Sequence, residues 1–303
     1  WALSDTVRNF TNSVPLQVLA DAKALMADST TVPRGELLGH YHFGEMDRVI
    51  HLRPGYGFGL SLFSSRIANF ESINSENMCG WYTGDGMTTL YNDQLDHYSD
   101  SYWPTVNPYR LPGTTVDTMV RTPPSNPTRA NGQSWRQSYP WVGGAKLDGV
   151  GSAGMQLDAW GCSLTAKKSW FMFDREIICL GAGIASSDGR VIETVVENRR
   201  LTSTGTNAFV VNGSVMPVNL GWSATVTNMT WAHLSGPANA GIGYYFPTTN
   251  SVRALREART GSWRDVNAGG STNPITRNYL TLWLDHGTSP SGASYAYVLL
   301  PCF

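Results

Sequence analysis

The strongest constraint on the fold is a change in hydrophobic periodicity near residue 30. Between Pro15 and Met26 apolar side chains recur at helical spacing, at Leu16, Leu19, Ala22, Leu25 and Met26. This spacing predicts one helix, with Ser13 placed to cap it and Asp28-Ser29 to end it. Beyond Pro33 the helical spacing disappears and short apolar runs take over. We therefore expect a helical segment over 1–32 and a separate β domain over 33–303.

Nine short runs after residue 33 have the alternation or the continuous apolar character of strands. Each is bounded by Gly, Pro, Asn, Asp or Ser, and they span residues 48–52, 58–63, 154–160, 168–173, 177–180, 191–197, 208–211, 279–284 and 295–299. Short strands between turn residues are typical of an all-β protein built from antiparallel sheets. Asp188-Gly189 predicts a hairpin that joins 177–179 to 191–195.

The charge balance excludes one large class of function. The chain carries 22 Lys and Arg against 23 Asp and Glu, a formal net charge of -1. Because phosphate contact needs a clustered basic surplus, we expect no nucleic acid as a partner. No apolar run approaches the ~20 residues that span a bilayer, so we expect no membrane partner. The first twenty residues also lack a signal-peptide pattern, and the chain is expected to be a soluble, mature or processed segment.

The sequence contains no convincing metal or cofactor motif. The four cysteines, Cys79, Cys162, Cys179 and Cys302, have no CxxC spacing, and free thiols are the expected state. His40-Tyr41-His42 alternates on a possible strand, which is a weak metal signal, and structural histidines are the favoured alternative. A P-loop, a Rossmann fingerprint and a GxSxG elbow are all missing. We expect neither a metal nor a cofactor.

The segment 69–86 has the most unusual composition, with carboxylates, amides and aromatic rings in a turn-rich run. This mixture suits a sugar site, where acids and amides bind hydroxyls while rings stack on pyranose faces. The alternative is a loop whose Asn side chains cap backbone groups. A second cluster forms either a ligand platform or packing at a sheet edge; it comprises Tyr98, Tyr102, Trp103 and Tyr109.

A series of spaced motifs resembles the central β domain of the polysaccharide lyases that cleave hyaluronan, chondroitin or xanthan. The motifs follow one another in the order of that family, and they cover nearly the whole chain from Pro33 onward. They are Asn74-Ser75-Glu76-Asn77, Gly80-Trp81-Tyr82, Asp85-Gly86, Tyr109-Arg110-Leu111-Pro112-Gly113, Trp141-Val142-Gly143-Gly144, Lys168-Ser169-Trp170-Phe171, Glu197-Asn198-Arg199, Gly261-Ser262-Trp263 with Asn267, and Asp285-His286-Gly287.

The resemblance implies a β-supersandwich, preceded by an (α/α) toroid of which residues 1–32 would be the helical end. In that family an Asn, a His, a Tyr and one or two Arg of the toroid carry out β-elimination, and the β domain supplies a Glu and an Asn. The Glu-x-x-Asn pattern falls on Glu71 and Asn74, which we therefore predict as catalytic residues. No residues here match those of the toroid, which would be a partner domain. A related calcium site is not predicted, because 107–113 lacks an acidic cluster.

Three further residues are predicted to bind an anionic polysaccharide in a secreted lyase. Asn77 lies in the same run as Asn74, and Arg66 could contact an anion or instead pair with a neighbouring acid. Trp135 lies near where related lyases place a ring that stacks on sugar, although it could also pack under the Pro-rich loop 122–133. The alternative function is a carbohydrate-binding β-sandwich without catalytic activity.

Overall fold

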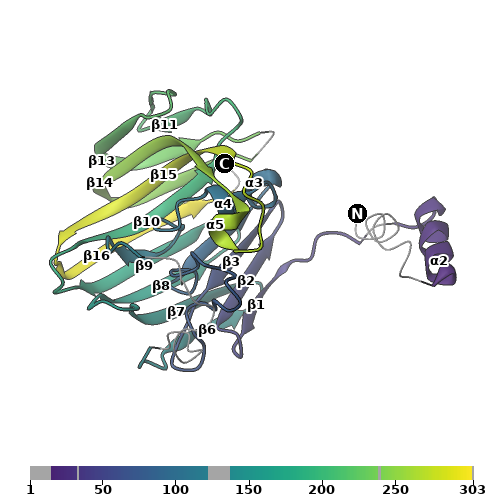
Figure 1. Cartoon of the computed structure of the whole chain (residues 1–303), viewed down its shortest axis with the longest axis horizontal. Coiled ribbons are helices and arrows are strands. Elements are labelled where there is room, and N and C mark those ends of the chain that lie inside the picture. Colours follow the sequence, from purple (N-terminus) through teal and green to yellow (C-terminus); the bar gives the residue numbers. More distant parts are fainter. Residues whose placement is uncertain (1–14, 33, 122–136, 238–239, 302–303) are drawn as a thin grey trace. The chain divides into compact units, whose positions relative to one another are not determined.

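The computed structural model describes residues 15–32, 34–121, 137–237 and 240–301 (Figure 1). The chain divides into two compact units, residues 1–37 and 38–303. Within the described ranges, no helix is long and apolar enough to cross a membrane. The second unit is built almost wholly of antiparallel strands, which confirms the predicted all-β class.

The first unit contains one described helix, α2 (Leu16–Ala27), which ends at Asp28 as its spacing predicts. The Asp28 carboxylate accepts hydrogen bonds from Thr30 and Thr31, and these bonds lower its pKa. The predicted cap Ser13 lies outside the described residues. Inside its own unit α2 buries two side chains and exposes most of its larger apolar ones, namely Leu16, Val18, Leu25 and Met26.

The second unit begins with a four-stranded sheet in which each strand pairs with the next. Its members are β1 (Gly39–Phe43), β2 (Arg48–Arg53), β3 (Tyr56–Ser61) and β4 (Met87–Tyr91). The pair β1–β2 places His40 opposite His51, so the His-Tyr-His run does lie on a strand. The sheet packs through Phe58 and Leu60 into the main core of the domain.

The remaining strands form one large antiparallel assembly. They are β5 (Thr115–Asp117), β6 (Val142–Leu147), β7 (Val150–Asp158), β8 (Thr165–Met172), β9 (Ile177–Ala185), β10 (Val191–Arg200), β11 (Phe209–Val211), β12 (Ser214–Val215), β13 (Ser223–Leu234), β14 (Ile242–Gly261), β15 (Ile275–Thr288) and β16 (Ser291–Leu300). Every run that the sequence pattern predicts as strand overlaps one of these strands or one in the smaller sheet.

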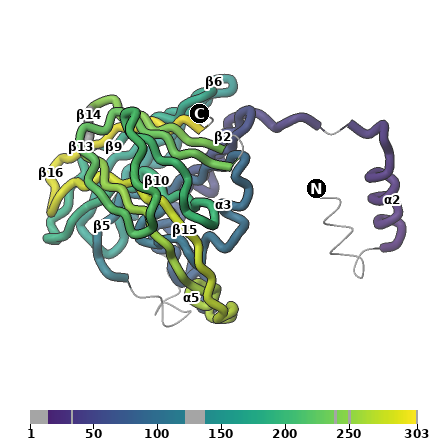
Figure 2. The backbone as a smooth tube through the Cα atoms, turned by 90° about the horizontal axis from the view of Figure 1, so that it is seen from above, coloured from purple at the N-terminus to yellow at the C-terminus, as the bar shows by residue number. Residues whose placement is uncertain are grey.

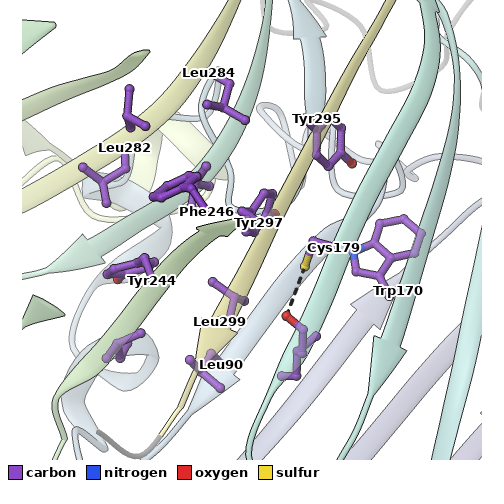
Figure 3. Close-up of a cluster of buried hydrophobic side chains, with 14 of the residues drawn as sticks. Leu90, Trp170, Cys179, Tyr244, Phe246, Leu282, Leu284, Tyr295, Tyr297 and Leu299 are labelled. Carbon is purple, nitrogen blue, oxygen red and sulfur yellow. Dashed lines mark hydrogen bonds between the residues drawn. The ribbon is translucent and has the colours of Figure 1, made fainter. Parts of the chain in front are cut away.

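Strand β14 connects the two halves of this assembly. Residues 243–245 of β14 pair with β16, whereas residues 252–261 pair with β15. The path therefore splits into β15, β10 and β5 on one side and β16, β9, β8, β7 and β6 on the other. One hydrophobic core joins both halves, and Figure 3 shows Leu282 and Leu284 of β15 in the same cluster as Tyr297 and Leu299 of β16.

The predicted hairpin across Asp188-Gly189 is wrong. Strand β9 pairs with β8 and β16, and β10 pairs with β15 and β5. The turn binds neighbouring loops instead: the Asp188 carboxylate accepts from the Ser163 amide at 2.7 Å, and the Gly189 amide donates to the Ser289 hydroxyl at 2.9 Å. Because nearly every side chain of β10 is buried, this strand needs cover on both faces and lies in the other half of the assembly.

Three single-turn helices were not predicted, because four residues are too few to show a helical period. They are α3 (Asp96–Ser99), α4 (Tyr102–Thr105) and α5 (Trp263–Val266). Tyr102 is fully buried against the rings of His97 and Tyr98, so packing explains the centre of this aromatic cluster. Helix α5 lies at the tip of the β14–β15 connection and projects from the sheets (Figure 2).

Candidate functional site

The loop 69–80 carries Glu71, Asn74 and Asn77, three of the five residues predicted to act on or bind substrate. Glu71 and Asn74 are exposed, and Asn77 is half-buried. The predicted bend is present, since Asn74 and Ser75 form a turn with φ of 53° and 60°. The convergence of Glu71 and Asn74 on one wall and their roles toward substrate both stay predictions.

Main-chain hydrogen bonds attach this loop to α5, although the two segments are far apart in sequence. The Met78 amide donates to the Val266 carbonyl at 2.8 Å, and the Ala268 amide donates to the Ser75 carbonyl at 2.9 Å. The Cys79 thiol lies 3.5 Å from the Asp265 carbonyl oxygen, which accepts from it. The loop and α5 therefore form one continuous surface, which we call the cleft wall and define as residues 71–80 and 262–270.

Helix α5 adds a cation and an aromatic ring to the cleft wall. A capping box fixes its first turn: the Asp265 carboxylate accepts from the Ser262 amide at 2.6 Å and from its hydroxyl at 2.9 Å. Trp263 is 40% exposed. Arg264 is also exposed, and it forms no ion pair with any residue that the structure describes. Both residues belong to the segment that main-chain bonds attach to loop 71–80.

Sequence reasoning did not select Arg264, although it directly follows the quoted Gly261-Ser262-Trp263 motif. Eighteen of the basic residues are Arg, so residue type alone does not distinguish one of them. The distinguishing signal is its lack of an ion-pair partner together with its place beside loop 71–80, and both are visible only in the fold.

The structure shows the alternative that was considered for Arg66, an ion pair with a neighbouring acid. Its guanidinium Nη2 lies 2.8 Å from Asp47 Oδ1, and Nη1 donates to the Pro140 carbonyl at 2.9 Å. The carboxylate of Asp47 is buried, whereas the Arg66 side chain is 47% exposed. Arg66 thus holds a turn of the small sheet, and its contact with a substrate anion stays a prediction. Trp135 lies outside the described residues.

A buried lysine supports the end of the segment 69–86 through main-chain carbonyls. The Lys168 ammonium, fully buried on β8, donates to the carbonyls of Asp85 at 2.9 Å and Gly113 at 2.5 Å. Burial raises the pKa of the Asp85 carboxyl to about 7 and lowers the pKa of the Lys168 ammonium to about 7. Perturbed pKa values can mark catalytic groups, but both side chains are closed off from solvent, which makes this pair a structural support.

The histidines of the described chain have structural partners rather than a common metal. His97 accepts from the Arg200 amide at 3.2 Å, and His286 Nε2 lies 2.8 Å from the Thr194 hydroxyl. His40 is bonded to His42 and His51. Among the described residues no cluster of three or more His, Cys, Asp or Glu side chains is arranged as metal ligands. Cys79, Cys162 and Cys179 are free thiols as predicted, and Cys302 lies outside the described residues.

The functional groups of the cleft wall are of kinds that suit an anionic sugar, but none of them is an obvious general base. Proton abstraction needs a poised group within hydrogen-bond reach of the proton that it removes. Besides three carboxylates, Glu71, Glu76 and the α5-capping Asp265, the wall offers amides, hydroxyls, the Cys79 thiol, one guanidinium and one indole. These groups suit charge neutralisation and sugar stacking, whereas the acid and base chemistry would come from a second surface.

The model of the super-sandwich domain of polysaccharide lyase family 8 matches residues 38–303. The chain is 46% identical to a xanthan lyase of Bacillus sp. (strain GL1), over 98% of the chain and 31% of that protein. It is 40% identical to a hyaluronate lyase of Thermasporomyces composti, over 99% of the chain and 38% of that protein.

Solved structures give the same result. A Paenibacillus xanthan lyase superposes with a TM-score of 0.90 at 50% identity, covering 100% of the chain and 29% of that protein. A chondroitin AC lyase of Streptomyces coelicolor A3, solved in complex with chondroitin sulphate, gives 0.78 at 40% identity, covering 95% of the chain and 36% of that protein. The chain thus spans about a third of the length of the relatives that it matches.

Proposed function

Because this chain belongs to polysaccharide lyase family 8 and comprises its super-sandwich domain, we propose that it forms one wall of the substrate cleft of a secreted polysaccharide lyase. The substrate is an anionic, uronate-containing polymer such as hyaluronan, chondroitin or a related polysaccharide, and the reaction is β-elimination. The observation that carries the proposal is the cleft wall, in which Glu71, Asn74 and Arg264 belong to one hydrogen-bonded surface.

The reaction explains why such a wall is needed. Removing the C5 proton of a uronate places further negative charge on the adjacent carboxylate, so a cation or hydrogen-bond donors must stabilise the transition state. Asn74 donates to the sugar, and Arg264 meets a carboxylate or another anionic group of the polymer. Glu71 beside a polyanion is a poor base, and we assign it to orienting a cation of the facing domain.

The facing domain is an (α/α) toroid, which supplies the acid and the base. Two observations support this part of the proposal. The chain spans about a third of its relatives, and α2 exposes Leu16, Leu25 and Met26, as a helix from a larger helical domain would. A polymer too large to enter a cell requires an extracellular enzyme, which is why we propose secretion.

The decisive experiment mixes this chain with hyaluronan, chondroitin sulfate or xanthan, with and without the toroid domain. Formation of unsaturated uronate is followed by its ultraviolet absorbance. We expect product only when both domains are present. Binding of polymer by this chain, with no product in either mixture, would favour the alternative of a carbohydrate-binding module.

The role of Arg264 is tested in the active mixture by Arg264→Ala. We expect KM to rise by about tenfold, because a charge-assisted contact contributes roughly 1.5–3 kcal/mol, and we expect the rise to shrink at high salt. Arg175→Ala is the matched control, since Arg175 is an exposed arginine in the β8–β9 turn. Equal effects of both substitutions would show that only general charge matters.

A further inference from the structure

Loop 71–80 concentrates backbone strain. Among the described residues nine other than glycine have positive φ, and three of these lie within four positions: Asn74 at 53°, Ser75 at 60° and Asn77 at 51°. The left-handed conformation costs a residue with a Cβ roughly 1–2 kcal/mol. Such strain persists only where the surroundings enforce it, and it gathers at functional sites. The contacts that enforce this conformation are therefore informative.

The Asn77 side chain is one of the contacts that close the loop, beside the Ser72 hydroxyl, which donates to the Glu76 carbonyl at 3.0 Å. The Asn77 amide Nδ2 donates to the Glu71 carbonyl at 2.7 Å, across six positions of sequence. A Cβ added at Gly80 would lie 2.4 Å from Asn77 Oδ1, so the absence of a side chain there leaves room for this carboxamide. The Asn77 donor is thus directed back into the loop, onto the main chain of the predicted catalytic residue.

We propose that Asn77 is a positioning residue for the lyase reaction, which fixes the main chain of Glu71 and so aims its carboxylate across the cleft. The inference rests on the proposed function of this domain. Without the Asn77 donor, the Glu71 carbonyl loses the hydrogen bond that ties it to the left-handed part of the loop, and the Glu71 main chain can shift. Asn77 then acts through Glu71 rather than on the sugar.

Asn77→Asp isolates the hydrogen bond. Aspartate has nearly the same size as asparagine and tolerates a positive φ, but its carboxylate cannot donate to the Glu71 carbonyl. Asn212→Asp is the matched control, because Asn212 also has a positive φ, 48°, and its Nδ2 donates to the Asn228 carbonyl at 2.8 Å. That site lies at the β11–β12 and β13 strands, outside the cleft wall.

The kinetic test uses the lyase assembled from this chain and its toroid domain. We expect Asn77→Asp to lower kcat about ten- to a hundredfold, the range for a misplaced group in an active site, with KM changed less than about twofold. Asn212→Asp leaves both values unchanged. In a Glu71→Gln background, Asn77→Asp adds less than about a twofold loss, since the residue that it positions has already been disabled.

A second measurement on the chain alone separates the inference from the proposed function. Hydrogen exchange of the Met78 and Ala268 amides, which bond the loop to α5, accelerates in Asn77→Asp and not in Asn212→Asp. Unchanged exchange, a rise in KM alone, or a full additional loss in the Glu71→Gln background would overturn the positioning role. Wild-type activity of Glu71→Gln would instead refute the proposed role of Glu71.

Discussion

Acid should weaken the contact between the two sheets through a chain of three histidines. His51 Nε2 donates to the Phe173 carbonyl at 2.8 Å, so its Nδ1 must accept. His40 Nδ1 lies 3.3 Å from His51 Nδ1 and donates to it, which leaves His40 Nε2 to accept from His42 Nε2 at 2.9 Å. The three neutral rings therefore form one chain of hydrogen bonds in which the position of each ring proton is fixed. The chain runs from half-buried His42 through His40 and His51 to Phe173, which follows β8.

Protonation of His40 disrupts this arrangement in the folded state. Its ring is fully buried, and burial, followed by the charges of His42, His51, Lys146 and Arg53, lowers its pKa to about 4. The pKa of His51 is lowered as well, chiefly by burial, and the Phe173 carbonyl and Asp174 oppose that shift. A third element, β3, brings the Tyr56 hydroxyl to the same Phe173 carbonyl at 3.0 Å.

The sign of the effect follows from the depressed pKa. Between about pH 6.5 and pH 4 the unfolded chain binds the proton and the folded chain does not. The free energy of unfolding therefore falls as the pH drops through this window. A pKa difference of about 2.5 corresponds to at most about 3 kcal/mol, and this bound applies to His40 alone.

Urea unfolding of the wild-type chain and of His40→Asn at each pH tests this prediction. Asparagine at position 40 can still donate to His51 but does not titrate. We expect the variant to be less stable at pH 7, and we expect the difference to shrink by up to about 3 kcal/mol by pH 4.5. Groups common to both chains cancel in the difference. A stability difference that is constant with pH would refute the reasoning.

Three further predictions concern the cleft wall and its support. In the assembled lyase Asn74→Ala should cost roughly 1–3 kcal/mol in transition-state binding. Glu71→Gln should cost more, because a cation of the facing domain is left unpaired. Wild-type turnover of both folded variants would show that the loop has only a structural role. Gly84→Ala places a Cβ 2.4 Å from the main-chain oxygen of Asn69 and should destabilise the domain by roughly 1–3 kcal/mol. An unchanged urea midpoint would contradict this prediction. Lys168→Met should destabilise by roughly 1–3 kcal/mol because the buried carbonyls of Asp85 and Gly113 lose their donor, and Asp85→Asn in the same chain should recover part of that loss because the Lys168 charge also acts on the buried Asp85 carboxyl.

The strands could be predicted from the sequence, but their partners could not. Alternation of apolar residues depends only on which face of a strand is buried, so it is visible locally. Pairing in a large assembly depends on contacts between distant segments, and the Asp188-Gly189 turn shows the consequence. Its composition suits a hairpin, yet the Asp188 carboxylate accepts from the Ser163 amide, the Gly189 amide donates to the Ser289 hydroxyl, and β10 lies beside β15.

The candidate site was predictable only in part, for the same reason. Glu71 and Asn74 were selected from a family pattern within one short segment. Arg264 lies nearly two hundred positions later and reaches that segment through main-chain bonds such as Met78 to Val266. Main-chain hydrogen bonds do not require a particular side chain, so the residue types in a sequence do not indicate where such bonds form. The ion pair of Arg66 with Asp47 was foreseen as an alternative, but composition could not choose between the two roles.

Two parts of the segment 69–86 are held in different ways: its C-terminal end near Asp85, and the loop 71–80 that contacts α5. The C-terminal end is held by buried Lys168, which donates to the Asp85 carbonyl. Loop 71–80 is attached to α5 by main-chain hydrogen bonds. The C-terminal end of the segment therefore depends on a buried side chain, Lys168, whose replacement would lower the stability of the domain. The contact between loop 71–80 and α5 depends on main-chain hydrogen bonds. Substitution of exposed side chains in α5, such as Trp263 and Arg264, therefore leaves that contact intact.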